Sequence, residues 1–179
     1  MIIHFISSKS NLKDDYPYLK QITVAIKKLG HELARNWVES EYKYSKSGKK
    51  PEDIDWREGH NDNMSALSRA DLVIAEASAK SFSTGFQVAN AIQLKKPVLI
   101  LTRNDALKGT FGSGISSDFV RNETYTSETL RDIITDFINE NNIDNKDLRF
   151  NFFIDRQIYN YLRWAAYKTG KNKSEILRE

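Results

Sequence analysis

The stretch of residues 70–101 constrains the fold most, because two short apolar runs in it flank a polar loop and a helical pattern. The runs at residues 71–75 and 97–101 are rich in Val, Leu and Ile, which is typical of strands buried on both faces of a sheet. Parallel strands need a crossover between them, and residues 86–94 have the pattern of a crossover helix. The stretch therefore predicts a parallel α/β sheet with helices on both faces.

The rest of the N-terminal region repeats this alternation. Further strands are expected at residues 2–6, 32–38 and 123–126, and further helices at residues 18–29, 53–69 and in a segment that Ser127 caps. The polar, lysine-rich residues 39–51 are expected to form a loop.

The composition excludes several classes of function. The chain has 179 residues, which suffice for one domain with a core and a small appendage. It contains no cysteine, so disulfides, thiolate catalysis and Cys-based zinc sites are excluded. No apolar run is long enough to span a bilayer, and the N-terminus is too polar after Ile6 for a signal peptide. We expect a cytoplasmic protein without membrane contact, and nothing in the sequence predicts a metal or cofactor.

The formal charge of +3 is unevenly distributed. Residues 146–179 contain eight Lys or Arg against four Asp or Glu, so the first 145 residues are close to neutral. A basic segment of this kind is either a solvated face or a surface that meets phosphates.

Three segments that follow expected strands are rich in Ser, Thr and Gly: residues 7–10, 78–85 and 102–117. The carboxyl ends of parallel strands meet at one edge of the sheet, where ligands bind in open α/β folds. Hydroxyl and backbone N–H groups there can hydrogen-bond a phosphate or a sugar. Each segment alone is more simply a turn, but together they predict a ligand site at this edge.

The central stretch resembles the nucleoside 2-deoxyribosyltransferase superfamily, and within it the 2'-deoxynucleoside 5'-phosphate N-hydrolase branch. Ala75-Glu76, Ser81, Gly85-Phe86 and the "LKKP" of residues 94–97 align without a gap with that branch's A-D-V-V-V-A-E, S-x-G-x-G-Y-E and L-G-K-P pattern. The resemblance covers about residues 1 to 140. It implies a flavodoxin- or Rossmann-like α/β domain over residues 1–142, which forms a homodimer or higher homo-oligomer whose subunits complete each other's sites.

In the family, a glutamate attacks the anomeric carbon of a deoxynucleoside or its monophosphate, and an aspartate assists proton transfer to the base. By position the glutamate falls on Gln87 and the aspartate on Asn63. An amide oxygen is a very poor nucleophile and no general base, although amides can still hydrogen-bond a ligand. The resemblance therefore implies a nucleoside- or nucleotide-binding pseudoenzyme with weakened or lost hydrolase activity.

Two alternatives stay open at this point. The protein is an active N-glycosidase or deoxyribosyltransferase if displaced acids replace the lost ones, and Asp62, next to Asn63, is the main candidate, with Glu76 a second. It is a structural or interaction protein if the pocket is empty. The remaining residues that the resemblance assigns to substrate binding are His4, at the place of a tyrosine near the sugar, Ser7 and Ser8 after the first strand, Ser81, which aligns with a phosphate contact, and Gly85 and Phe86.

After a linker at residues 143–148, residues 149–179 resemble a ribbon-helix-helix module. Apolar residues at 150, 152 and 154 predict a strand, and a helix ending at Gly170 follows. Ser174 is expected to cap a second helix, which reaches Glu179 within about two turns. The expected inward side chains of the first helix are Ile158, Leu162, Ala165 and Ala166.

In that family two chains pair their strands and place the outward side chains in the DNA major groove. These side chains correspond here to Arg149, Asn151 and Phe153, of which Arg and Asn suit guanine and adenine edges. The alternative is an arm that dimerises the protein without contacting DNA.

Overall fold

The computed structural model describes residues 1–47, 55–104, 114–115, 117–142 and 153–177. The chain divides into two compact units, Met1–Asn142 and Ile143–Glu179. Within the described residues, no helix is long and apolar enough to cross a bilayer.

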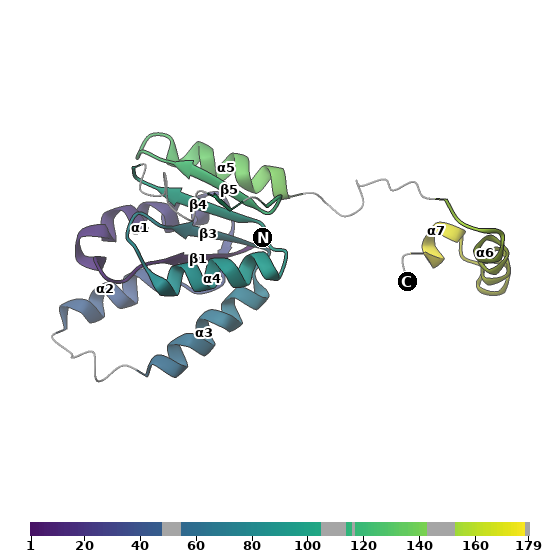
Figure 1. Cartoon of the computed structure of the whole chain (residues 1–179), viewed down its shortest axis with the longest axis horizontal. Helices are drawn as coiled ribbons and strands as arrows, with labels where there is room; N and C mark the ends of the chain where they lie inside the picture. The colour runs from purple at the N-terminus through teal and green to yellow at the C-terminus, as the bar shows by residue number, and fades with distance from the viewer. Residues whose placement is uncertain (48–54, 105–113, 116, 143–152, 178–179) are drawn as a thin grey trace. The chain divides into compact units, whose positions relative to one another are not determined.

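The first unit is built on a five-stranded sheet in which every neighbouring pair of strands is parallel (Figure 1). Its strand order is β2-β1-β3-β4-β5, so the predicted flavodoxin-like α/β fold is confirmed. The strands are β1 (Ile2–Ser7), β2 (Glu32–Leu33), β3 (Leu72–Glu76), β4 (Val98–Thr102) and β5 (Val120–Thr124).

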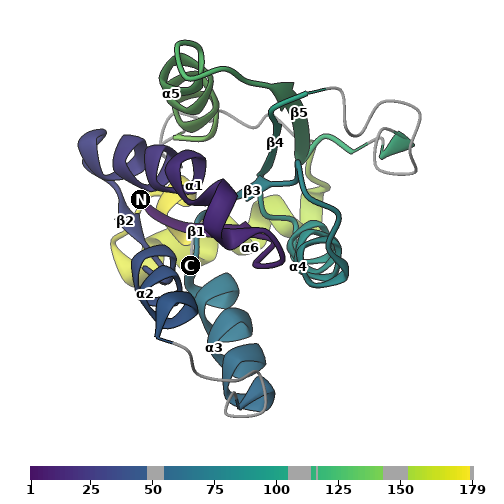
Figure 2. The ribbon, with the colours of Figure 1, turned by 90° about the vertical axis from the view of Figure 1, so that its left-hand side faces the viewer.

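Helices cover both faces of the sheet (Figure 2). Alternate strand residues serve the two faces. One core contains Ile3, Phe5 and Ile74 and packs against α1 (Leu12–Lys28) and α5 (Leu130–Asn141). The other core contains Ile6, Val73, Ala75 and Ile100 and packs against α3 (Trp56–Arg69) and α4 (Phe82–Gln93). Strands β3 and β4 are buried on both faces of the sheet, which is why their sequences are almost continuously apolar.

A helix, α2 (Val38–Lys46), occupies most of the segment expected to be a loop, and β2 is only two residues long. Trp37 is buried beside the helix start, and its indole N–H donates to the Phe5 carbonyl at 2.8 Å. The Tyr42 ring stacks on Tyr16 of α1 with centroids 3.6 Å apart. Because α2 is held by these few contacts rather than by a long apolar stripe, its helical periodicity is weak in the sequence.

Several helices begin at other residues than the pattern predicted. Helix α1 begins six residues early, and α4 begins at Phe82, where Ser81 accepts a hydrogen bond from the Thr84 N–H at 3.2 Å. The cap residue of α5 is Thr129, so the prediction that Ser127 caps this helix is wrong. The first turns of α1 and α4 contain only one apolar residue each, and an apolar periodicity therefore does not reveal them.

The second unit contains α6 (Arg156–Thr169) and α7 (Lys173–Ile176). Gly170 ends α6 with a φ of +70°, a conformation that suits glycine. Asn172, and not Ser174, caps α7, in a reciprocal pair with Glu175. Ile158 is half-exposed in contrast to its expected inward place, whereas Leu162 and Ala165 are buried.

The expected strand of the second unit is not seen in its described part, since residues 153–155 form no regular structure. Arg149 and Asn151 lie outside the described residues, and Phe153 is fully exposed.

A buried carboxylate, Glu76, connects the carboxyl ends of the strands. It accepts hydrogen bonds from the hydroxyls of Ser7 at 3.3 Å, Tyr125 at 3.4 Å and Ser78, and it pairs with the Arg103 Nε at 3.3 Å. Burial, and then the neighbouring carboxylate, raise the pKa of Tyr125 well above its usual range, so its hydroxyl stays a donor. Glu76 thereby links the ends of β1, β3, β4 and β5.

Arg103 extends this network to α1. Its guanidinium pairs with the buried Asp15 at 2.6 Å and lies over the Tyr18 ring, 4.4 Å from the centroid. One cation therefore neutralises two buried carboxylates.

Replacement of this cation tests the network. Arg103→Met leaves Glu76 and Asp15 buried without a partner, and we expect the free energy of unfolding to fall by about 3–5 kcal/mol in urea titration. Arg121→Met is the matched control, because Arg121 pairs with two carboxylates at the surface. It is expected to cost less than about 1 kcal/mol. Equal losses in the two variants would contradict a structural role for the buried network.

Candidate functional site

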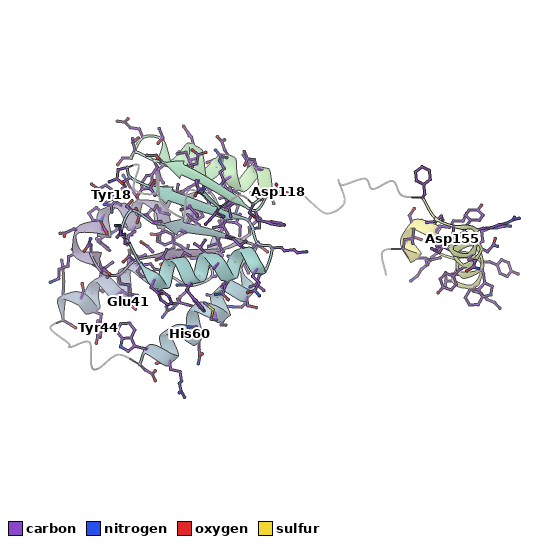
Figure 3. The ribbon with its side chains drawn as sticks, viewed as in Figure 1. Tyr18, Glu41, Tyr44, His60, Asp118 and Asp155 are labelled. Atoms are coloured by element: carbon purple, nitrogen blue, oxygen red, sulfur yellow. The ribbon has the colours of Figure 1, made fainter. Side chains whose placement is uncertain are left out.

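A pocket of about 580 Å³ opens at the carboxyl edge of the sheet. The chain runs from β1 outward to β2 and then returns to β3 on the other side of β1, and ligands bind at such a reversal in open α/β sheets. The lining residues come from the loop after β1, the segment after β2, and helices α2, α3 and α4. Figure 3 shows three of them, Glu41 and Tyr44 on α2 and His60 on α3.

The pocket contains most of the side chains that the sequence suggested. These are Ser7, Ser8, Asp62, Asn63, Ser81, Phe86 and Gln87. Two suggested residues do not line it. Gly85 lies within α4 with open space beside its Cα, and His4 lies fully buried next to Gln87.

The Gln87 side chain is held at both ends of its amide and is only 5% exposed. Its Oε1 lies 3.0 Å from the His4 Nε2, and its NH₂ donates to the Ser83 carbonyl at 3.3 Å and to the Ser83 hydroxyl at 3.4 Å. The contact with a carbonyl oxygen requires a donor, which fixes which end of the amide faces His4. A glutamate carboxylate at position 87 has no proton to donate to that carbonyl oxygen. These surroundings therefore suit glutamine better than glutamate.

His4 is neutral in this arrangement. Burial lowers the pKa of His4, the hydrogen bond with Gln87 opposes this, and the Arg35 charge lowers it further. The neutral ring donates its Nε2–H to Gln87, and its Nδ1 has no hydrogen-bond partner among the described residues.

Arg35 hydrogen-bonds both Asn63, the second of the two amides, and its neighbour Asp62. One guanidinium nitrogen donates to the Asn63 Oδ1 at 2.8 Å, and the other donates to the Asp62 carboxylate at 3.2 Å. Asp62 therefore lines the pocket as half of an ion pair and not as a free base. Sequence reasoning missed Arg35, because the strand expected over residues 32–38 placed it within the sheet, whereas β2 ends at Leu33 and leaves Arg35 at the carboxyl edge.

The serine hydroxyls are partly committed within the protein. Ser7 donates to Glu76, Ser8 accepts from the Ser10 N–H at 3.2 Å, and Ser81 accepts from the N–H of Thr84. The hydroxyl protons of Ser8 and Ser81 are not used in these bonds, so both residues can donate to a ligand.

Aromatic rings form one side of the pocket mouth. The Phe86 ring lies 5.9 Å from the His60 ring and 6.3 Å from the Phe82 ring, and Trp56 is exposed one helical turn before His60. Such faces can stack on a planar base. The site offers amides, hydroxyls and aromatic faces beside its charged side chains, and in its described part no group of three or more His, Asp or Glu could hold a metal.

The buried neutral His4 predicts a pH dependence of stability. In the unfolded chain His4 takes up a proton near its ordinary pKa of 6.5, whereas in the folded protein its pKa is lower. The unfolded state therefore binds more protons below about pH 6.5, and the free energy of unfolding should fall as the pH decreases from neutral, by up to about 1.4 kcal/mol per pH unit.

Denaturant titrations between about pH 7.5 and 5 measure this slope. His4→Gln should flatten it, because the new side chain does not titrate, whereas His60→Gln at the open pocket should leave it largely unchanged. An unchanged slope in His4→Gln would show that His4 is not the group responsible.

The comparisons with known proteins are limited to structure. No protein-family model matches the chain, and no curated protein matches it in sequence. Among solved structures, the CMP N-glycosidase BcmB of Clostridium botulinum matches with a TM-score of 0.53 and 12% identity, over 76% of this chain and 99% of that one. A 2-deoxyribosyltransferase from Bacillus psychrosaccharolyticus matches with a TM-score of 0.47 and 13% identity, over 86% of this chain and 100% of that one. The chain thus shares the fold of the N-glycosidase.

Proposed function

We propose that the first unit binds a nucleoside or nucleotide in this pocket without cleaving it at a useful rate. The observation that carries the proposal is that two amides, Asn63 and Gln87, stand in one cavity at the positions where the resembled family has its two acids. Both are fixed by hydrogen bonds, Gln87 to His4 and Ser83, and Asn63 to Arg35. They are placed to recognise hydroxyl or base groups and cannot supply a nucleophile or a general base.

The alternative of an active N-glycosidase with displaced acids has less support. Asp62 is paired with Arg35, and Glu76 is fully buried, occupied by four partners and absent from the pocket wall. Glu58 and Glu41 also line the pocket, but they lie on α3 and α2, whereas the family's nucleophile position is on α4.

Restoring both acids tests the proposal. We expect no base release by the natural chain from the four 2'-deoxynucleosides or their 5'-monophosphates in a chromatographic assay. The double variant Gln87→Glu, Asn63→Asp should release base at a rate at least about tenfold above the detection limit set by the natural chain. The reason is that general acid–base groups typically contribute 10²-fold or more. Gln93→Glu, an exposed position on the same helix, is the matched control and should stay inactive.

Two results would decide against the proposal. Base release by the natural chain that disappears in Asp62→Asn would establish the displaced-acid enzyme. Absence of any thermal shift with these compounds, in a chain that is folded, would establish that the pocket binds none of them.

We also propose that the second unit joins two copies of the chain, so that the protein is a homodimer. Its described part buries only Leu162 and Ala165, while α6 exposes Tyr161, Trp164 and Tyr167. So small a core does not stabilise a unit of this size, and exposed aromatic side chains in such numbers mark an interaction surface. We further propose that the dimer contacts DNA through Arg149, Asn151 and Phe153.

Light scattering of the full chain tests the assembly. We expect a dimer that Trp164→Glu weakens at least about tenfold, since loss of a buried aromatic anchor costs 2 kcal/mol or more. Arg156→Glu, at the first residue of the same helix, is the control for the added charge. A monomer at all concentrations contradicts the proposal, and absence of a gel shift at low salt removes its DNA step.

A further inference from the structure

The charged groups of the pocket bear on the kind of ligand that it accepts. Two cations, Lys9 and Arg35, line the described part of the pocket, together with four carboxylates, Glu41, Asp55, Glu58 and Asp62. The balance is therefore negative before any ligand enters.

Both cations are already neutralised by carboxylates of the same pocket. The Lys9 ammonium lies 2.6 Å from the Glu41 carboxylate, and Arg35 lies 3.2 Å from that of Asp62 while also holding Asn63. A ligand phosphate would have to displace one of these carboxylates or lie beside it, and both choices are unfavourable for a group with nearly two negative charges.

The other two carboxylates add to this repulsion. Asp55 accepts hydrogen bonds from the N–H groups of Arg57 and Glu58 at the start of α3, so the helix end partly offsets its charge. Glu58 makes no ion pair in the part of the chain that the structure covers.

We infer that the pocket takes a nucleoside without a phosphate group, in preference to the corresponding 5'-monophosphate. The inference rests on the proposed function, which leaves the phosphorylation state of the ligand open. The uncharged groups of the site suit such a ligand: the rings of Phe86 and His60 offer stacking faces for a base, and Gln87, Asn63 and the free hydroxyl protons of Ser8 and Ser81 offer partners for sugar hydroxyls.

Calorimetric titration of the full chain with the four 2'-deoxynucleosides and their four 5'-monophosphates at low salt tests the inference. We expect the best nucleoside to bind at least about tenfold more tightly than its monophosphate, and the difference to shrink as salt is added, because salt screens the repulsion. A monophosphate that binds more tightly than its nucleoside overturns the inference and leaves the proposed function intact. If neither binds, the proposed function fails and the inference fails with it.

Removal of one charge from the pocket is a second, independent test of the preference for a nucleoside. Glu41→Gln frees Lys9 from its partner, so the ratio of monophosphate to nucleoside affinity should rise about fivefold. Glu39→Gln is the matched control, since it removes the same charge from the same helix at a residue that does not line the pocket, and it should leave this ratio within about twofold. An equal rise in both variants would show that overall charge, and not the Lys9–Glu41 pair, sets the preference.

Discussion

The buried carboxylate of Glu76 is the constraint on which the ligand-binding edge of the sheet depends. An ionised group without solvent contact is tolerated only if partners surround it, and here they come from the ends of four strands and, through Arg103, from α1. The ends of these four strands are therefore held relative to one another before a ligand arrives. A pocket at strand ends that are held in this way gains a defined shape, which reduces the cost of ordering side chains on binding.

The same edge contains an acid, Glu76, and an amide, Gln87, in different surroundings. The surroundings of Glu76 donate hydrogen bonds and supply a cation, whereas the surroundings of position 87 accept a hydrogen bond from the side chain. A glutamate placed there would meet the Ser83 carbonyl and the neutral His4, and it would favour a protonated histidine. His4 and Gln87 thus fit each other as a neutral pair, and a change of the amide alone back to a carboxylate would alter the histidine as well.

The sequence predicted the sheet well because strands buried on both faces need continuous apolar runs, as at β3 and β4. It failed at α2, whose position depends on the Tyr16–Tyr42 stack and the Trp37 hydrogen bond. It also failed at the start of α7, where Asn172 and Glu175 form a capping box, and at the start of α5, where the cap residue Thr129 makes no side-chain cap hydrogen bond. At the site, an alignment by position suggested that Asn63 and Gln87 share a cavity, but it could not suggest Arg35 or the paired state of Asp62. Those depend on contacts between segments that are distant in the sequence.

The fold and the site therefore support different conclusions. The sheet order creates a pocket at the reversal beside β1 whatever side chains line it, which is why a fold shared with a CMP N-glycosidase at 12% identity does not transfer that protein's activity. What the pocket does follows from its own groups: two amides that cannot become nucleophiles, a histidine that burial keeps neutral, and cations that are already occupied by carboxylates. Each of these removes charge that glycosidic bond cleavage or phosphate recognition would use. The hydrogen-bonding and stacking groups that line the site are the basis of our proposal that it binds a ligand without transforming it.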